Sequence, residues 1–333
     1  MSVLSPTRTA APTRQPDLLQ RLFQREAYML LVLLGLVVAI VLIVVPESRQ
    51  PRVFFDLLRE VAPNLIAVIG ISLLMIGGEF DLTVGAMLAA VGVVTVTVFN
   101  LTQTMGWGIV AGLATGPLVG AILGIFVTRL KMTSLMTTLG MMFALRGAVY
   151  VYTNKTPIVD KNQFESFIWL YQGSIGPVAV PTILAIVLIV AFVIISTQTE
   201  FGRHIFAVGG NAHAARVSGI HVERVKFLLF VLSGTMSAIA GLLVAAQTGT
   251  GYFDAGLGFE LLVITATVLG GVSLAGGQGS LLGAVLGVLI LGMTGKGLRL
   301  MAMPTTTQLV VTGLVMMLAV YLHGLRKRVL TCR

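Results

Sequence analysis

Long apolar runs constrain this chain more than any other feature. Runs of roughly twenty apolar residues recur along its 333 residues, and a helix of that length crosses a bilayer core of about 30 Å. Only 11% of the residues are charged, against about 25% in a soluble globular protein. Unbroken runs exclude a transmembrane barrel, whose strands are short and alternate. The pattern predicts an all-α polytopic membrane protein.

Ten spans are predicted, which places both termini on one side of the membrane. With the termini in the cytoplasm, the inner segments carry roughly twice as many Lys and Arg residues as the outer ones, as the positive-inside rule requires. The net charge of +9 therefore reflects topology and does not indicate nucleic acid. The expected spans are 28–46, 61–77, 84–100, 106–128, 133–152, 180–197, 226–246, 257–271, 279–295 and 304–323.

The chain divides into three parts. Residues 1–27 are expected to form a disordered cytoplasmic tail without a cleavable signal, because residues 2–16 are rich in Ser, Thr, Pro and Arg. Residues 28–323 form the transmembrane domain, and residues 324–333 form a basic cytoplasmic tail. The single cysteine, Cys332, excludes a disulfide framework and a cysteine-based metal site.

The two halves of the chain resemble each other. Gly116–Gly124 matches Gly279–Gly287, and a weaker match relates Gly78–Asp81 to Gly251–Asp254. Both pairs lie five spans apart, so the halves have opposite orientations in the membrane. Two inverted five-helix repeats are typical of transporters. The alternative is that small residues recur because they allow close helix packing.

The polar run 200–227 lies between two spans, and the segment 198–226 is predicted to be a cytoplasmic docking loop. Gly209, Gly210 and Asn211 break the run, after which residues 212–217 are predicted to form a short helix that Gly219 ends. A flexible linker would lack the apolar residues found here. The pattern favours a folded knob that docks into another protein. The alternative is an ordinary basic cytoplasmic loop.

Charged residues close to the membrane interior are costly and suggest function. Asp81 or Thr83 is expected to cap the helix that follows, and a substrate path or gate is the functional interpretation of this segment. Arg146 lies within a span and is expected to bind substrate hydroxyls, to pair with an acidic residue, Asp254 or Glu260, or to snorkel to the outer interface. The predicted path or gate comprises Glu79, Asp81, Thr83, Arg146, Phe253, Asp254 and Glu260.

Catalytic motifs are absent from the sequence. It contains no phosphate-binding loop, H-E-x-x-H, G-x-S-x-G or zinc-ligand spacing. The chain is therefore predicted to be no enzyme, to hold no metal and to hydrolyse no nucleotide by itself.

Four stretches bring a family resemblance over residues 60–323. Asp81–Gly85, the pair Thr138–Gly140 with Arg146–Gly147, and the pair Glu260–Leu261 with Gly270–Leu274 are similar to motifs of permease subunits of bacterial ATP-binding cassette (ABC) importers for ribose, xylose and related simple sugars. The polar run resembles that family's coupling loop more specifically. The matching residues there are Gly202, Arg203, Gly209, Gly210, Asn211, Ala214, Ala215, Arg216, Ser218, Gly219 and Ile220. Phe80, Thr83, Leu262 and Val272 depart from the family pattern.

The resemblance implies a membrane permease in the bacterial inner membrane. Two permease subunits, identical or paralogous, would form the pathway above an ATPase dimer, and the helix 212–219 would sit in a cleft of the ATPase. A periplasmic or surface-tethered binding protein would deliver a sugar or small polyol of unspecified identity. The chain itself would hold no cofactor, since ATP binds the partner. The alternative is an ion-coupled secondary transporter using Glu79, Asp81, Asp254 and Glu260 as ion ligands.

Overall fold

The structure, a computed structural model, describes residues 26–162, 164–304, 306–308, 310–311, 313–314 and 317. The predicted terminal tails and most of the expected span 304–323 lie outside these residues. The described part confirms an all-α membrane protein: seven helices are long and apolar enough to cross a bilayer. They are α3 (Pro51–Ile76), α4 (Val84–Thr102), α5 (Met105–Thr128), α6 (Ser134–Thr153), α8 (Val180–Gln198), α11 (Val222–Thr248) and α13 (Leu281–Leu300).

Two further apolar helices coincide with predicted spans. They are α2 (Glu26–Val44) and α12 (Phe259–Leu269), and α12 has only 11 residues. The expected span 61–77 is part of a longer helix, because α3 begins at Pro51. Proline suits the first turn of a helix, and the charged residues that follow do not stop it. The sequence interpretation missed this extension because it followed the apolar run alone.

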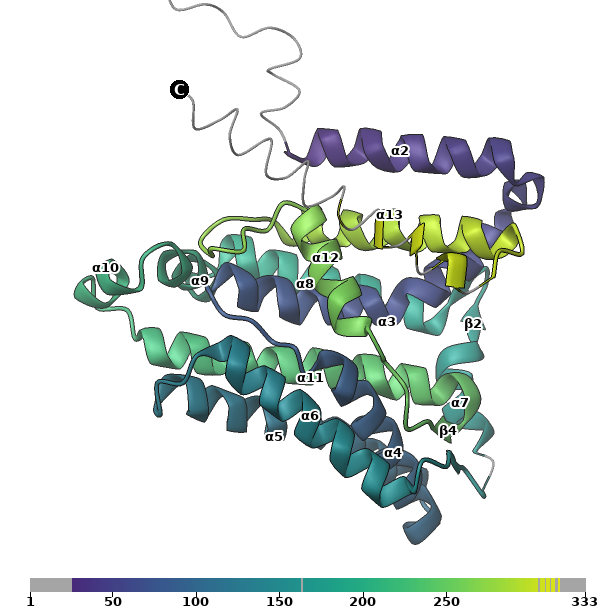
Figure 1. Ribbon diagram of the computed structural model, residues 1–333, viewed down its shortest axis with the longest axis horizontal. Helices are drawn as coiled ribbons and strands as arrows, with labels where there is room; N and C mark the ends of the chain where they lie inside the picture. The colour runs from purple at the N-terminus through teal and green to yellow at the C-terminus, as the bar shows by residue number, and fades with distance from the viewer. Residues whose placement is uncertain are drawn as a thin grey trace, which may run out of the picture.

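The short elements gather at the two ends of the bundle (Figure 1). At one end α10 (Ala212–Val217) projects beyond the long helices, with α9 (Glu200–Gly210) beside it, and this is called the α10 end. Among the described residues, the opposite end carries α7 and four short strands in two antiparallel pairs, β1 with β4 and β2 with β3. The bounds are η1 (Pro46–Arg49), α7 (Glu165–Gln172), β1 (Ile158–Val159), β2 (Ser174–Ile175), β3 (Val178–Ala179) and β4 (Thr250–Gly251).

Close helix contacts in the core depend on glycines of α5. Gly116, Gly120 and Gly124 are spaced by four residues, so they share one face, which packs on α11. A Cβ atom at Gly116 would lie 2.2 Å from the carbonyl oxygen of Gly234, and one at Gly120 would lie 2.4 Å from that of Phe230. Small residues at such positions let two backbones approach within the membrane.

The glycines that match between the two halves of the sequence do not contact corresponding helices. Gly283 and Gly287 of α13 lie against the backbone of α12, whereas the matched glycines of α5 lie against α11. Gly279 precedes α13 instead of belonging to it, and its φ is +142°. The matched stretches therefore use the same small residues for different helix pairs.

Candidate functional site

The α10 end is built around a single break between two helices. Asn211 has extended backbone, and its Oδ1 accepts a hydrogen bond from the amide of Ala214 at 2.9 Å, which caps α10. The predicted helix 212–217 is confirmed, and it ends before Gly219, whose φ is +86°. The expected break at Gly209 and Gly210 is wrong, because both residues belong to α9. The chain turns at Asn211 alone, since only there does the backbone leave helical geometry.

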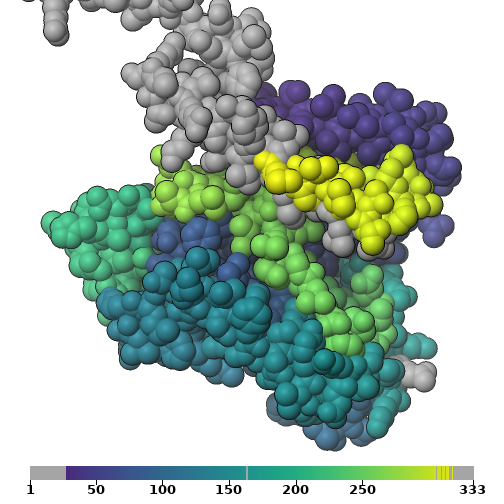
Figure 2. All heavy atoms as spheres, in the orientation of Figure 1, coloured from purple at the N-terminus to yellow at the C-terminus, as the bar shows by residue number. Residues whose placement is uncertain are grey.

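The predicted docking residues divide into anchors and exposed positions. Ala215 anchors α10 against the bundle and is 5% exposed, whereas Val217 at the end of α10 is 78% exposed. In Figure 2, α9 and α10 form a knob that projects beyond the other helices on this face. Gly202 is also buried, and Gly209 and Ile220 are half-buried. Arg203, Gly210, Asn211, Ala214, Arg216, Ser218 and Gly219 are exposed.

A charged cluster connects α10 to two other elements. Oε1 of Glu223, in the first turn of α11, lies 2.6 Å from Nη2 of Arg216 and 3.2 Å from Nζ of Lys131. Lys131 belongs to the turn between α5 and α6. A single carboxylate thus joins α10, α11 and this turn. Sequence reasoning did not predict this cluster, because its members are far apart along the chain.

The segment between α3 and α4 is non-helical and leads from the α10 end into the bundle (Figure 1). Glu79 pairs with Lys226 at 2.5 Å. Oδ2 of Asp81 accepts a hydrogen bond from Ser233 at 2.7 Å, and its Oδ1 accepts from the amide and hydroxyl of Thr83 at 2.8 and 2.5 Å. Asp81 is only 1% exposed, so the structure places it in the protein interior.

Thr83 does not provide the expected side-chain cap of α4, whereas Oδ1 of Asp81 accepts a hydrogen bond from the amide of Thr83 just before the helix. Thr83 occupies the position before the helix, but its side chain makes no cap hydrogen bond. Its φ of −76° and ψ of −14° are helical, whereas a capping residue needs extended backbone. The Thr83 hydroxyl donates to Asp81 instead, so Asp81 braces the segment that precedes α4.

A second non-helical segment, 252–258, enters the bundle from the opposite end (Figure 1). Arg146 of α6 holds it, because Nη1 donates to the carbonyl oxygens of Phe253 at 3.2 Å and Ala255 at 2.8 Å. The predicted pairing of Arg146 with Asp254 or Glu260 is wrong. Carbonyl groups outside a helix lack partners within the membrane, and the guanidinium satisfies two of them.

Tyr150 completes this contact. Its hydroxyl donates to Oδ1 of Asp254 at 2.5 Å, and its ring packs against that of Phe253 at a centroid distance of 5.9 Å. Sequence reasoning missed Tyr150. A signal was present, because Tyr150 follows Arg146 by four residues and therefore lies on the same face of α6.

The segment 252–258 meets the first turn of α4 at Gly256 and Gly85. A Cβ atom at Gly256 would lie 2.4 Å from the carbonyl oxygen of Gly85. The carboxylate of Glu260 lies against Gly85 as well, and its buried Oε2 has no hydrogen-bond partner among the described residues. The predicted path residues thus lie on the two non-helical segments, on α6 (Arg146) and on α12 (Glu260).

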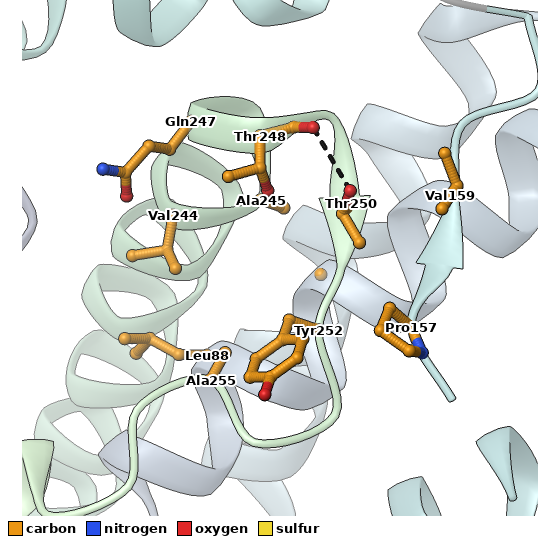
Figure 3. A pocket seen from close by; sticks show the side chains of 11 residues that line it. Leu88, Pro157, Val159, Val244, Ala245, Gln247, Thr248, Thr250, Tyr252 and Ala255 are labelled. Carbon is orange, nitrogen blue, oxygen red and sulfur yellow. Dashed lines mark hydrogen bonds between the residues drawn. The ribbon is translucent and has the colours of Figure 1, made fainter. Parts of the chain in front are cut away.

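A pocket of about 480 Å³ opens beside the segment 252–258, between α4 and α11 (Figure 3). The ring of Tyr252 points into it, opposite Leu88 and Val244. Pockets of roughly 300–1,000 Å³ suit small molecules. The described lining residues carry no charge, and polar groups come from Gln247, Thr248, Thr250 and Tyr252. The sequence interpretation did not find this pocket.

Comparisons with known proteins decide the family. A family model described as "Branched-chain amino acid transport system / permease component" matches residues 53–320. The ribose import permease protein RbsC of Escherichia coli K12 is 34% identical over 294 residues, covering 86% of this chain and 91% of the relative. This chain belongs to the ABC-importer permease family. As a permease subunit it is a multi-pass membrane protein and not an enzyme.

Other members of the permease family are similar over most of their length. The L-arabinose transport system permease protein AraH of Escherichia coli K12 is 37% identical over 251 residues, covering 75% of this chain and 76% of the relative. The ribose import permease protein RbsC of Bacillus subtilis is 36% identical over 289 residues, covering 87% of this chain and 90% of the relative. No solved structure matches the chain. The ion-coupled alternative finds no support in these matches.

Proposed function

We propose that this chain is the membrane-spanning subunit of an importer that carries a monosaccharide or a related small polyol. A separate ABC ATPase dimer hydrolyses the ATP, and a periplasmic or surface-tethered binding protein delivers the substrate. The observation that carries the proposal is α10, a capped helix that projects from the bundle with Val217 exposed. An isolated helix of six residues is unstable in water, so its capped and anchored form suits a fixed docking element.

The coupling loop also supports an orientation. Arg129, Lys131, Arg216 and Arg224 lie at the α10 end, and basic residues favour the cytoplasmic side. In this orientation, in the bacterial inner membrane, both termini are cytoplasmic and the pocket beside Tyr252 faces outward. The binding protein would then deliver its cargo to the pocket end.

The pocket lining favours a neutral polyhydroxy substrate over an amino acid. An amino acid carries two charges, and buried charges need partners. The described lining offers hydroxyl and amide groups from Gln247, Thr248 and Thr250, and the ring of Tyr252, but no charged side chain. The relatives named for ribose and arabinose agree with this choice, although the family model is named for amino acids.

Two inverted five-helix repeats are part of the proposal. The helix pairing supports them. In such a repeat α5 corresponds to α13, and α3 corresponds to α11. The packing of α5 on α11 is therefore the counterpart of the packing of α13 on α3. The non-helical segments 79–83 and 252–258 lie near the matched stretches and enter from opposite ends. Broken helices that meet inside the membrane are typical of inverted-repeat transporters. A second permease subunit, identical or paralogous, would complete the pathway.

The test is reconstitution of this chain with its ABC ATPase and a panel of loaded binding proteins in liposomes. We expect one loaded binding protein to stimulate both ATP hydrolysis and uptake of its sugar. Val217→Asp should prevent ATPase binding, because it places a charge on the projecting helix. Ile175→Asp is the matched control, since Ile175 is 64% exposed at the opposite end. Uptake driven by an ion gradient without any ATPase would refute the proposal.

A further inference from the structure

Glycines from three distant parts of the chain meet at the C-terminal end of α9. Gly78 follows α3, Gly209–Gly210 ends α9, and Gly276–Gly277 lies between α12 and α13. The amide of Gly277 donates to the carbonyl oxygen of Ile76 at 2.8 Å. We call these five glycines the glycine junction.

No side chain separates the backbones at this junction. A Cβ atom at Gly209 would lie 1.7 Å from the carbonyl oxygen of Ile76 and 2.7 Å from the amide nitrogen of Gly277. A Cβ atom at Gly277 would lie 2.5 Å from Cα of Gly210, and one at Gly276 would lie 2.8 Å from Cα of Gly78. Real Cβ atoms do not approach other atoms so closely, so only glycine fits these contacts.

Direct contact between backbones makes the junction stiff. A side chain between two elements can change rotamer and absorb a displacement, whereas two touching backbones must move together. Gly276 and Gly277 also have positive φ values of +82° and +71°, which holds their loop in a shape that other residues rarely adopt.

The glycine junction lies next to α10 in the sequence, and it also connects to both halves of the bundle. Only Asn211 separates Gly210 from α10. Gly78 is followed by the segment that contains Asp81, after which α4 begins. Gly277 is followed by α13. A displacement of α10 therefore reaches α4 and α13 through the same point.

The ion pairs form a softer connection from α10. Glu223 reaches Arg216 and Lys131 through long side chains, and its own side chain is 42% exposed. Exposed ion pairs are weak and are screened by salt. Of these two connections, the glycine junction is the stiffer.

We propose that the glycine junction is the joint through which α10 displaces the α3–α4 and α12–α13 segments together. Gly209, Gly276 and Gly277 act as positioning residues: they touch no substrate and set how far ATPase movement reaches the two halves. The inference rests on the proposed function, since it requires an ATPase that moves α10.

Two helical glycines provide a matched test. A Cβ atom at Gly209 meets the backbones of two other segments, whereas nothing lies within 4 Å of a Cβ atom at Gly106, near the start of α5. In liposomes containing the complete transporter, we expect Gly209→Ala to lower sugar transported per ATP hydrolysed by about tenfold, with ATPase binding retained. Gly106→Ala should match the wild type. Equal ratios in the two variants would overturn the joint.

A labelling experiment keeps the proposal testable if Gly209→Ala does not fold. In a Cys332→Ser background, a fluorophore on Leu274→Cys reports on the α12–α13 segment, where Leu274 is 48% exposed. We expect ATP binding to change its emission, with a smaller change for Ile175→Cys at the opposite end. An unchanged signal at position 274 in a complex that hydrolyses ATP would overturn the joint alone. Failure of the ATPase to bind the wild-type chain would overturn the proposed function and the joint together.

Discussion

Nζ of Lys226 lies 2.5 Å from Oε1 of Glu79, although the two residues are 147 positions apart in the sequence. The pair joins α11 to the segment between α3 and α4. The side chain of Lys226 is 22% exposed and that of Glu79 is 10% exposed, so the pair is largely removed from solvent. Removing one partner of such a pair leaves an unpaired buried charge, which costs more than the pair contributes.

Lys226→Met should therefore destabilise the protein by about 2–3 kcal/mol, because the carboxylate of Glu79 loses its counter-ion. The double variant Lys226→Met with Glu79→Gln should recover part of this loss, since no charge remains unpaired. Thermal unfolding in detergent measures both. Lys131→Met is the control: Lys131 is 65% exposed, and such exposed pairs contribute about 1 kcal/mol or less. Equal losses of stability in the two lysine variants would contradict the prediction that the buried pair matters more than the exposed one.

The cap of α10 gives a second prediction. Asn211→Ala removes the acceptor for the amide of Ala214 and should cost about 1 kcal/mol of helix stability. This loss is a large part of the stability of a helix of six residues, so ATPase binding should weaken several-fold. Asn211→Asp keeps a side-chain oxygen and should bind as the wild type does. Affinity of the ATPase for detergent-solubilised permease is the measurement. Equal affinities for the Ala and Asp variants would show that the cap does not matter.

Glu223 allows stability and coupling to be separated. Its partners Arg216 and Lys131 are both more than half exposed, so Glu223→Gln should change the free energy of unfolding by about 1 kcal/mol or less. The loss of charge should nevertheless loosen α10 from α11 and lower uptake at constant ATPase binding. Glu200→Gln is the control, because the side chain of Glu200 is 77% exposed and lies 4.0 Å from Nε2 of His204 on its own helix. Unfolding curves and uptake rates of the two variants show whether Glu223 affects transport independently of stability.

Elements with a strong local signal were predictable from the sequence. Apolar run length predicted α4, α5 and α6 to within two residues at either end, because membrane thickness fixes the length of such helices. Residue type alone predicted α10, since Gly219 ends it and Asn211 begins it. The start of α3 was missed for the converse reason: charged residues can continue a helix once it has left the apolar layer.

Contacts between distant segments were not predictable from one sequence. The pair Glu79–Lys226 depends on which helices lie side by side, and spacing along the chain carries no such information. The sequence shows Gly78, Gly209 and Gly277 individually, each beside a second glycine. Their meeting at one point requires the three-dimensional path of α3, α9 and the α12–α13 segment.

Tyr150 gives the last prediction, at the opposite end from α10. Tyr150→Phe keeps the ring contact with Phe253 and removes only the hydroxyl that donates to Asp254. Hydrogen bonds to charged groups contribute about 1.5–3 kcal/mol, so the variant should unfold at a lower temperature. The carboxylate of Asp254 would then lack its donor, and the segment 252–258 should separate from α6 more readily.

The matched control is Tyr152→Phe, because Tyr152 lies on the same helix and is 59% exposed. Unfolding temperature and proteolysis within residues 252–258 are measured for both variants. We expect both measures to change for Tyr150→Phe and neither to change for Tyr152→Phe. A loss of stability in both variants would assign the effect to the surface of α6. A faster cleavage in Tyr150→Phe alone would show that this hydrogen bond holds the segment beside the pocket in place.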